Sequence, residues 1–179
     1  QYWDKADSTK SCMKLPEPLQ LTSSKSFTVD DFDWSPDGQQ IVFSHRPTMA
    51  IEDYIKSDIS LVNIESKEVM SLVSAPGPDG DPVFGPNGQS IVYLSNNGDT
   101  TSIYHSNNVV KQLNLNNGRS SVINLGIDEN IRTLKWKGNQ LYFIARLKTK
   151  QFLYAFDLKE KTSTPIKSSP DNIYGYTLS

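Results

Sequence analysis

Acidic side chains just ahead of aromatic residues are the groups in this sequence best suited to chemistry. Asp31 and Asp81 each lie three residues before an aromatic residue, Trp34 and Phe84 respectively. Paired carboxylates can act as general acid and general base. Their matched placement in two copies of one phrase favours a structural role instead, in which each carboxylate accepts backbone hydrogen bonds where two repeats meet. We therefore predict that these residues are not catalytic.

The sequence offers little else for nucleophilic or metal chemistry. It has no Gly-x-Ser-x-Gly elbow, and its two histidines, His45 and His105, are isolated and expected in or beside loops. Cys12 is the only cysteine, which excludes an internal disulfide framework and a cysteine-based zinc site. We predict no catalytic residue, no metal and no cofactor in this chain.

The acidic residues belong to a phrase that occurs twice, about fifty residues apart. Residues 31–43 read DFDWSPDGQQIVF, and residues 81–93 read DPVFGPNGQSIVY. Asp-Gly and Asn-Gly supply the positive φ of a tight hairpin turn, and the apolar run after each turn is typical of a buried strand. Residues 134–144 form a third copy, with Lys-Gly-Asn at the turn. Repetition at this period indicates β-propeller blades.

We predict an all-β fold built from blades of four antiparallel strands, as an incomplete propeller of about three blades with partial flanking strands. The strands are expected at about 31–34, 41–45, 58–63 and 69–73, then 81–84, 91–95, 109–115 and 121–125, then 131–136, 141–147, 152–158 and 163–167. Residues 19–22 and 172–179 are expected to be strands of an earlier and a later blade.

The repeats divide the chain into five predicted segments. These are the end of a preceding blade or an extension (1–26), three blades (27–76, 77–127 and 128–168) and the first strand of a following blade (169–179). Propellers close with about four to eight blades, so three blades and two fragments are not expected to close alone. We expect a piece of a longer protein. Self-association through open blade edges is a further possibility.

Two long loops are the candidate binding region. Residues 46–57 link two predicted strands of the first blade, and residues 96–105 form a similar long loop in the second. In the third blade only residues 148–150 link the equivalent strands. Long loops on a rigid scaffold are where binding tends to be placed. If the blades stack in register, both loops project from one face. The candidate contacts to a ligand or partner are Arg46, Glu52, Asp53, Tyr54 and Tyr104. Alternatively, these residues merely cover a blade or a domain interface.

Composition excludes some classes of function. The chain is 36% hydrophobic and 21% charged, with a formal net charge of -2. Lys and Arg are scattered among acids, which gives no electrostatic footprint for nucleic acid, and no stretch approaches the length needed to span a bilayer. We predict no nucleic-acid partner and no membrane span.

The phrases WSPDG at 34–38, SDISLVN at 57–63 and DGDPVFGPNG at 79–88 resemble the propeller repeats of prolyl oligopeptidase-family serine peptidases, especially the acylaminoacyl-peptidase and dipeptidyl-peptidase branch. The resemblance covers the chain from about Leu19 onward. Similar repeats build the TolB propeller of the periplasm. In the peptidase family the propeller covers an α/β-hydrolase domain and filters substrates by size. In dipeptidyl peptidases it also lends acidic residues that hold the substrate's free amino terminus.

The resemblance implies that the catalytic Ser, Asp and His belong to a hydrolase domain absent from this chain, and that the parent protein is a serine peptidase. Glu52-Asp53 does not match the family's paired-glutamate motif, so that role is not carried over. The implied function is non-catalytic gating or positioning of peptide substrates. The implied partners are the substrate and the hydrolase domain. The alternative is a TolB-like scaffold for protein partners. Periplasmic, secreted and cytoplasmic locations are all allowed, and the resemblance favours the periplasm.

Overall fold

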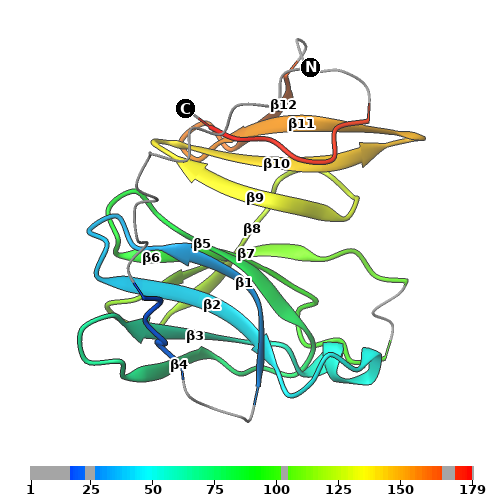
Figure 1. Ribbon diagram of the computed structural model, residues 1–179. Helices are drawn as coiled ribbons and strands as arrows, with labels where there is room; N and C mark the ends of the chain where they lie inside the picture. The colour runs from blue at the N-terminus through cyan, green and yellow to red at the C-terminus, as the bar shows by residue number, and fades with distance from the viewer. Residues whose placement is uncertain (1–16, 23–26, 102–104, 167–171, 179) are drawn as a thin grey trace, which may run out of the picture.

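The computed structural model describes residues 17–22, 27–101, 105–166 and 172–178. They form three four-stranded sheets, each antiparallel and each paired in sequence order. Figure 1 shows the sheets stacked as successive layers. Within these ranges, no helix is long and apolar enough to cross a membrane.

The strand boundaries agree with the predicted ones to within a few residues. The first sheet contains β1 (Thr28–Trp34), β2 (Gln40–Arg46), β3 (Asp58–Asn63) and β4 (Val69–Val73), with the short 3-10 helix η1 (Ile51–Lys56) between β2 and β3. The second contains β5 (Asp79–Phe84), β6 (Ser90–Ser95), β7 (Val109–Asn114) and β8 (Ser120–Ile123). The third contains β9 (Ile131–Lys137), β10 (Gln140–Leu147), β11 (Lys150–Asp157) and β12 (Thr162–Pro165). The all-β class with four-stranded antiparallel blades is confirmed.

The repeated phrase forms the first hairpin of each sheet. Gly38, Gly88 and Gly138 have φ of 70°, 69° and 57°, a region that favours glycine. In the first turn, Asp37 Oδ1 accepts a 2.6 Å hydrogen bond from Ser35 Oγ and a 3.0 Å bond from the backbone N–H of Gln39. The third turn keeps the left-handed glycine although it lacks Pro-Asp, which explains why the blade survives that change.

The middle sheet is buried on both faces by its neighbours. On β6, Ile91 and Tyr93 pack with Val42 and Ile59 of the first sheet. Val92, between them, belongs to the opposite core, where it packs with residues of the third sheet such as Phe143. Alternate side chains of a strand point to opposite faces, so one strand serves two interfaces. Burying each large apolar side chain contributes roughly 1.5–3 kcal/mol, so the stack is held mainly by these two cores.

Carboxylates link the first strands of successive sheets. Asp33 Oδ2 accepts a 2.8 Å hydrogen bond from the backbone N–H of Phe84, and Asp81 Oδ2 accepts a 2.9 Å bond from the N–H of Leu134. The predicted role is confirmed for Asp81. For Asp31 it is wrong, because Asp33 makes the link from β1.

The two matched positions differ in backbone conformation, since Asp81 has a φ of 48° and Asp31 is not among the described non-glycine residues with a positive φ. The irregularity in β1 ends two residues before Trp34, at Phe32, whereas that in β5 ends one residue before Phe84, at Val83. A bulge re-aims the side chains beside it. Asp31 instead contributes its backbone N–H, which donates a 3.1 Å bond to Ser44 Oγ.

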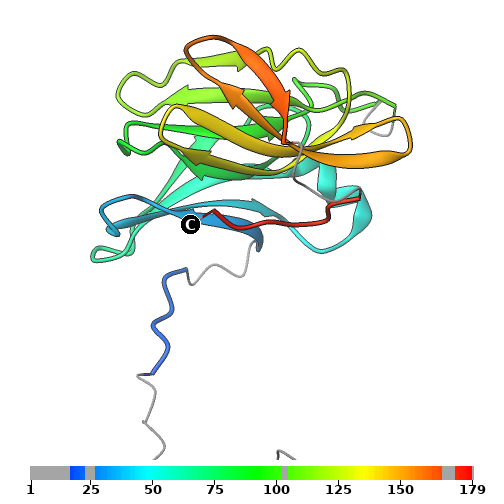
Figure 2. The same cartoon turned by 90° about the horizontal axis from the view of Figure 1, so that it is seen from above.

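The two predicted flanking strands differ from the structure. Residues 17–22 and 172–178 carry no strand ladder, since an extended segment becomes a strand only where a neighbour completes its hydrogen bonds. Residues 172–178, red in Figures 1 and 2, run along the third sheet. There the N–H of Ile173 donates to the carbonyl of Gln151 at 3.1 Å, and Tyr176 Oη donates to the carbonyl of Thr133 at 2.7 Å.

The link between β1 and β5 can be tested by substitution. Asp33→Ala is expected to lower the free energy of unfolding by about 1–3 kcal/mol, because it leaves the Phe84 N–H without an acceptor. Urea unfolding followed by circular dichroism measures the loss. Glu65→Ala, at an exposed turn position, serves as the matched control and is expected to change little. Equal stability of the two variants would contradict the assigned role of Asp33.

Candidate functional site

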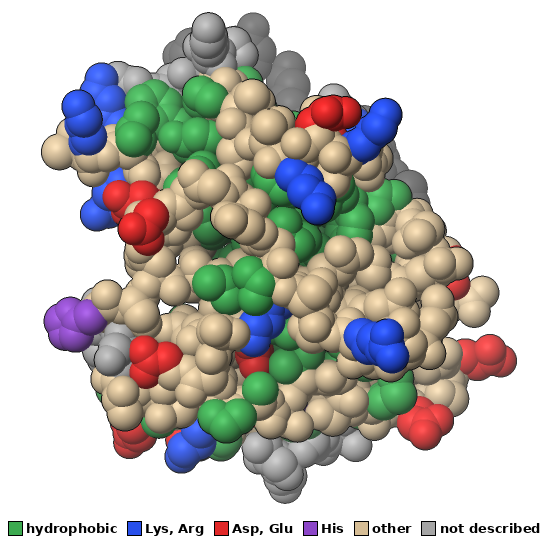
Figure 3. Space-filling model, turned by 180° about the vertical axis from the view of Figure 1, so that it is seen from behind, with side chains coloured by type: hydrophobic (Ala, Val, Ile, Leu, Met, Phe, Trp, Pro, Cys, Tyr) green, Lys and Arg blue, Asp and Glu red, His purple; other side chains and the backbone are tan. Residues whose placement is uncertain are grey.

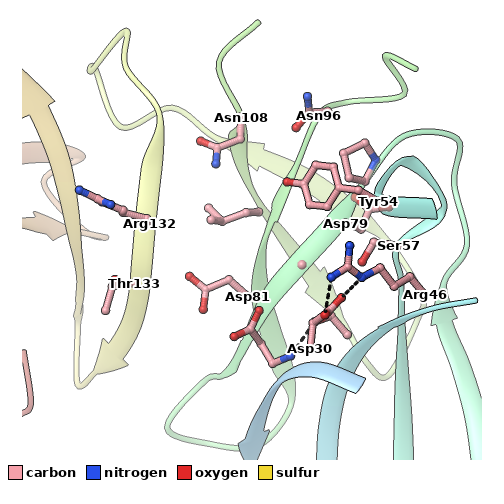
Figure 4. A pocket seen from close by; sticks show the side chains of 15 residues that line it. Asp30, Arg46, Tyr54, Ser57, Asp79, Asp81, Asn96, Asn108, Arg132 and Thr133 are labelled. Carbon is pink, nitrogen blue, oxygen red and sulfur yellow. Dashed lines mark hydrogen bonds and ion pairs between the residues drawn. The ribbon is translucent and has the colours of Figure 1, made fainter. Parts of the chain in front are cut away.

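A cavity of about 530 Å³ lies where the first strands of the three sheets meet the long loops (Figure 4). Its walls come from β1, β5 and β9 and from the segments that follow β2 and β6. Arg46 and Tyr54 of the first long loop line it together with Asn96 of the second. The prediction that the two loops project from one face is therefore confirmed for the described residues.

The predicted site residues divide between this cavity and other places. Arg46 and Tyr54 line the cavity, whereas Glu52 and Asp53 do not. Glu52 is exposed on η1. Asp53 is buried and accepts hydrogen bonds from Thr48 Oγ1 and Lys56 Nζ, each 2.6 Å long, so it organises the loop. Tyr104 lies outside the described residues. A ligand contact by any of them stays a prediction.

Arg46 is committed to an ion pair at the cavity wall. Its Nη2 donates to Asp30 Oδ1 at 3.1 Å, and its Nε lies 3.0 Å from Asp30 Oδ2. The two side chains are only 15% and 24% exposed, so the pair is well shielded from water. This pair ties the end of β2 to the bulge of β1 and neutralises one of the acids that face the cavity.

Three further carboxylates line the cavity and were not predicted as site residues. They are Asp31, Asp79 and Asp81. Burial raises the pKa of Asp31, and the nearby Asp30 adds to that shift. Burial likewise raises the pKa of Asp81, opposed by the Leu134 N–H and reinforced by the charge of Asp31. These acids therefore hold a proton more readily than exposed aspartates do.

Asp79 is the most deeply buried of these groups. It is 1% exposed, and its Oδ2 has no hydrogen-bond partner among the described residues. Burial raises its pKa to about 6, against the opposing effects of a hydrogen bond with Ser95 and the charge of Lys111, while Asp58 adds to the rise. The sequence does not predict this role for Asp79, because its burial depends on how the first two sheets pack.

His45 lies away from the cavity and plays a packing role. The sequence predicts it in or beside a loop, but it is part of β2 and is paired with Asp58 of β3. Its Nε2 lies 2.8 Å from Ser60 Oγ, and its ring packs 4.6 Å from that of Phe27. Burial lowers its pKa, so the ring favours the neutral form. His105 is exposed at a turn.

The geometry of the cavity suits binding more than covalent chemistry. No group of three or more His, Cys, Asp or Glu side chains in the described ranges is placed to hold a metal ion. The cavity presents carboxylates, two asparagine side chains and the ring of Tyr54. Seen from behind, basic and acidic side chains are interspersed over the surface, with no broad patch of one charge (Figure 3).

Known protein structures share this architecture. TolB from Acinetobacter baumannii superposes with a TM-score of 0.69 over 87% of this chain and 36% of its own, at 17% identity. The tricorn protease superposes with a TM-score of 0.65 over 83% of this chain and 19% of its own, at 14% identity. The chain is a β-propeller segment. The described part of this segment supplies three blades, corresponding to the three sheets.

One curated relative shares sequence as well as pattern. The propeller segment is 30% identical over 151 residues to dipeptidyl-peptidase 5 of Porphyromonas gingivalis (strain ATCC 33277). The match covers 80% of the segment but 21% of the relative, so the segment spans about a fifth of that protein's length. No family model matches the segment.

The charge on Asp79 provides a pH-dependent prediction. With a pKa of about 6 in the folded state against 3.8 ordinarily, Asp79 keeps its proton over a pH range in which the unfolded chain has lost it. The folded state is therefore favoured at low pH, and this contribution is lost as the pH rises through 6. At about pH 7.5, Asp79→Asn is expected to raise the free energy of unfolding by about 1–3 kcal/mol.

Urea unfolding of both proteins at a series of pH values checks this expectation. The gain from Asp79→Asn is expected to shrink below about pH 6 and to vanish near pH 4. Glu65→Gln, which removes an exposed carboxylate, is the control. A gain that is the same at all pH values would show that charge burial is not its cause.

Proposed function

We propose that this propeller segment is a non-catalytic part of a serine peptidase of the prolyl oligopeptidase family, of the dipeptidyl- or acylaminoacyl-peptidase type. Its role is to gate or position peptide substrates for a hydrolase domain outside this chain. The observation that carries the proposal is the 30% identity with dipeptidyl-peptidase 5 over 80% of the segment. The structural likeness to the tricorn protease supports the fold on which such a role would rest.

The cavity supports a role in handling peptides. It opens where the three blades meet the long loops, a position from which a propeller can contact chains that approach its centre. Arg46 and Tyr54 stand at its wall, with carboxylates beside them. Peptides carry charged termini and hydrogen-bonding backbones, which such groups can recognise. The proposed partners are the peptide substrate and the hydrolase domain of the same parent chain.

A second candidate is a TolB-like scaffold that binds protein partners through one propeller face. The superposition on TolB, with a TM-score of 0.69, favours it. The exposed side chains of Phe32 and Trp34, which are 63% and 52% accessible, would also permit self-association through the first blade. A scaffold would require no hydrolase domain, which separates the two candidates experimentally.

The proposed function predicts the size and reactivity of the native protein. An antibody raised against this chain is expected to detect, in the source cells, a band several times larger than 20.1 kDa. The same band is expected to react with a fluorophosphonate probe, which labels activated serine nucleophiles. A band near 20.1 kDa that takes no label would contradict the peptidase proposal and favour the scaffold. Preincubation with unlabelled fluorophosphonate is the control for specific labelling.

A further inference from the structure

The cavity carries more negative charge than its own cations balance. Asp30 is paired with Arg46, and the other ion pair of the described residues, Lys56 with Asp53, lies on the loop. No Lys or Arg among those residues lies within 4 Å of the carboxylates of Asp31, Asp79 or Asp81. In Figure 4 the guanidinium of Arg132 points away from Asp81, toward the third sheet.

Asp31 and Asp81 form the open pair of carboxylates. They come from neighbouring blades, on β1 and β5, and line the same cavity; the charge of Asp31 raises the pKa of Asp81, and the charge of Lys135 opposes that rise. One oxygen of Asp81 is held by the Leu134 N–H, which fixes the side chain and leaves its other oxygen for a further bond. Two like charges that line one partly dehydrated cavity repel each other, and a cation placed between them would relieve that repulsion.

Asp79 gives an independent indication of a missing group. This residue lines the same cavity, is 1% exposed and has a carboxylate oxygen without any partner among the described residues. Buried polar atoms in folded proteins nearly always have a partner, so an orphan of this kind requires an explanation. A positive ligand in the cavity would interact favourably with this charge, because the surroundings screen it less than water would.

The chemistry of the pocket selects an organic cation. Since no three acidic, His or Cys side chains of the described residues converge as metal ligands do, a small divalent ion is poorly matched. A guanidinium is planar and carries five N–H donors in a fixed fork, so it can bridge two carboxylates that a single ammonium would contact less completely. A volume of about 530 Å³ has room for an arginine side chain together with the peptide that bears it.

We infer that this cavity binds the guanidinium of a peptide arginine side chain between Asp31 and Asp81, with the buried Asp79 adding negative charge to its wall. The inference rests on the cavity alone. It therefore stands whether the propeller segment belongs to a peptidase or to a scaffold, and its failure would leave the fluorophosphonate result unaffected.

Isothermal titration calorimetry measures the binding of three peptides to the 179-residue chain. Two of the peptides are blocked at both ends, and the third has a free amino terminus. Acetyl-Ala-Arg-Ala-amide is expected to bind at least tenfold more tightly than acetyl-Ala-citrulline-Ala-amide, the neutral analogue of nearly the same shape. This comparison needs no protein variant. Equal affinity for the two peptides would overturn the inference. Tighter binding of unblocked Ala-Ala-amide than of the arginine peptide would also overturn it, in favour of an amino-terminal ligand.

A substitution then locates the site. Asp31→Asn is nearly isosteric and removes a carboxylate that makes no hydrogen bond within the described residues, since the residue bonds to Ser44 through its backbone N–H. It is expected to weaken binding of the arginine peptide at least fivefold and to leave the citrulline peptide unchanged. Glu65→Gln is the matched control and is expected to alter neither. The contrary result is a folded Asp31→Asn protein that keeps both its affinity for the arginine peptide and the tenfold preference over the citrulline peptide. That result would place the guanidinium elsewhere and overturn the inference.

Discussion

The structure depends on the stacking of one sheet on the next, because a four-stranded sheet cannot bury both of its faces by itself. The middle blade has a neighbour on each face, so Ile91 and Tyr93 are buried on one side and Val92 on the other. The first blade differs: Trp34 is 52% exposed, whereas Phe84, at the matching position of the second blade, is 4% exposed. A neighbouring sheet makes the difference.

Stacking alone does not fix how the first strands of neighbouring blades align, and the carboxylate links supply that alignment. Asp33 and Asp81 each reach a backbone N–H of the next blade. Asp81 stands at a bulge with a φ of 48°, a conformation that aspartate tolerates better than most residues. The same bulges bring acidic side chains to the cavity. Asp81 therefore both links two blades and contributes to the site's negative charge, whereas Asp33 only links blades.

Features set by local chemistry could be predicted from the sequence. The Asp-Gly and Asn-Gly turns and the alternating apolar runs determined the twelve strands to within a few residues. The shared loop face followed from the repeat. The exchange of roles between Asp31 and Asp33 could not be predicted, because it depends on which carboxylate meets a backbone N–H about fifty residues further along the chain. The burial of Asp79 and the structural use of Asp53 likewise depend on contacts between distant segments.

The most direct test of this account is native-state amide hydrogen exchange at Phe84 and Leu134. Their N–H groups bond to carboxylates of the preceding blade rather than to a neighbouring strand of their own sheet. The account predicts that both exchange as slowly as the ladder amides of β6 and β10, since they open only when the blades separate. Exchange at the rate of exposed loop amides would show that the carboxylate links do not hold the blades together.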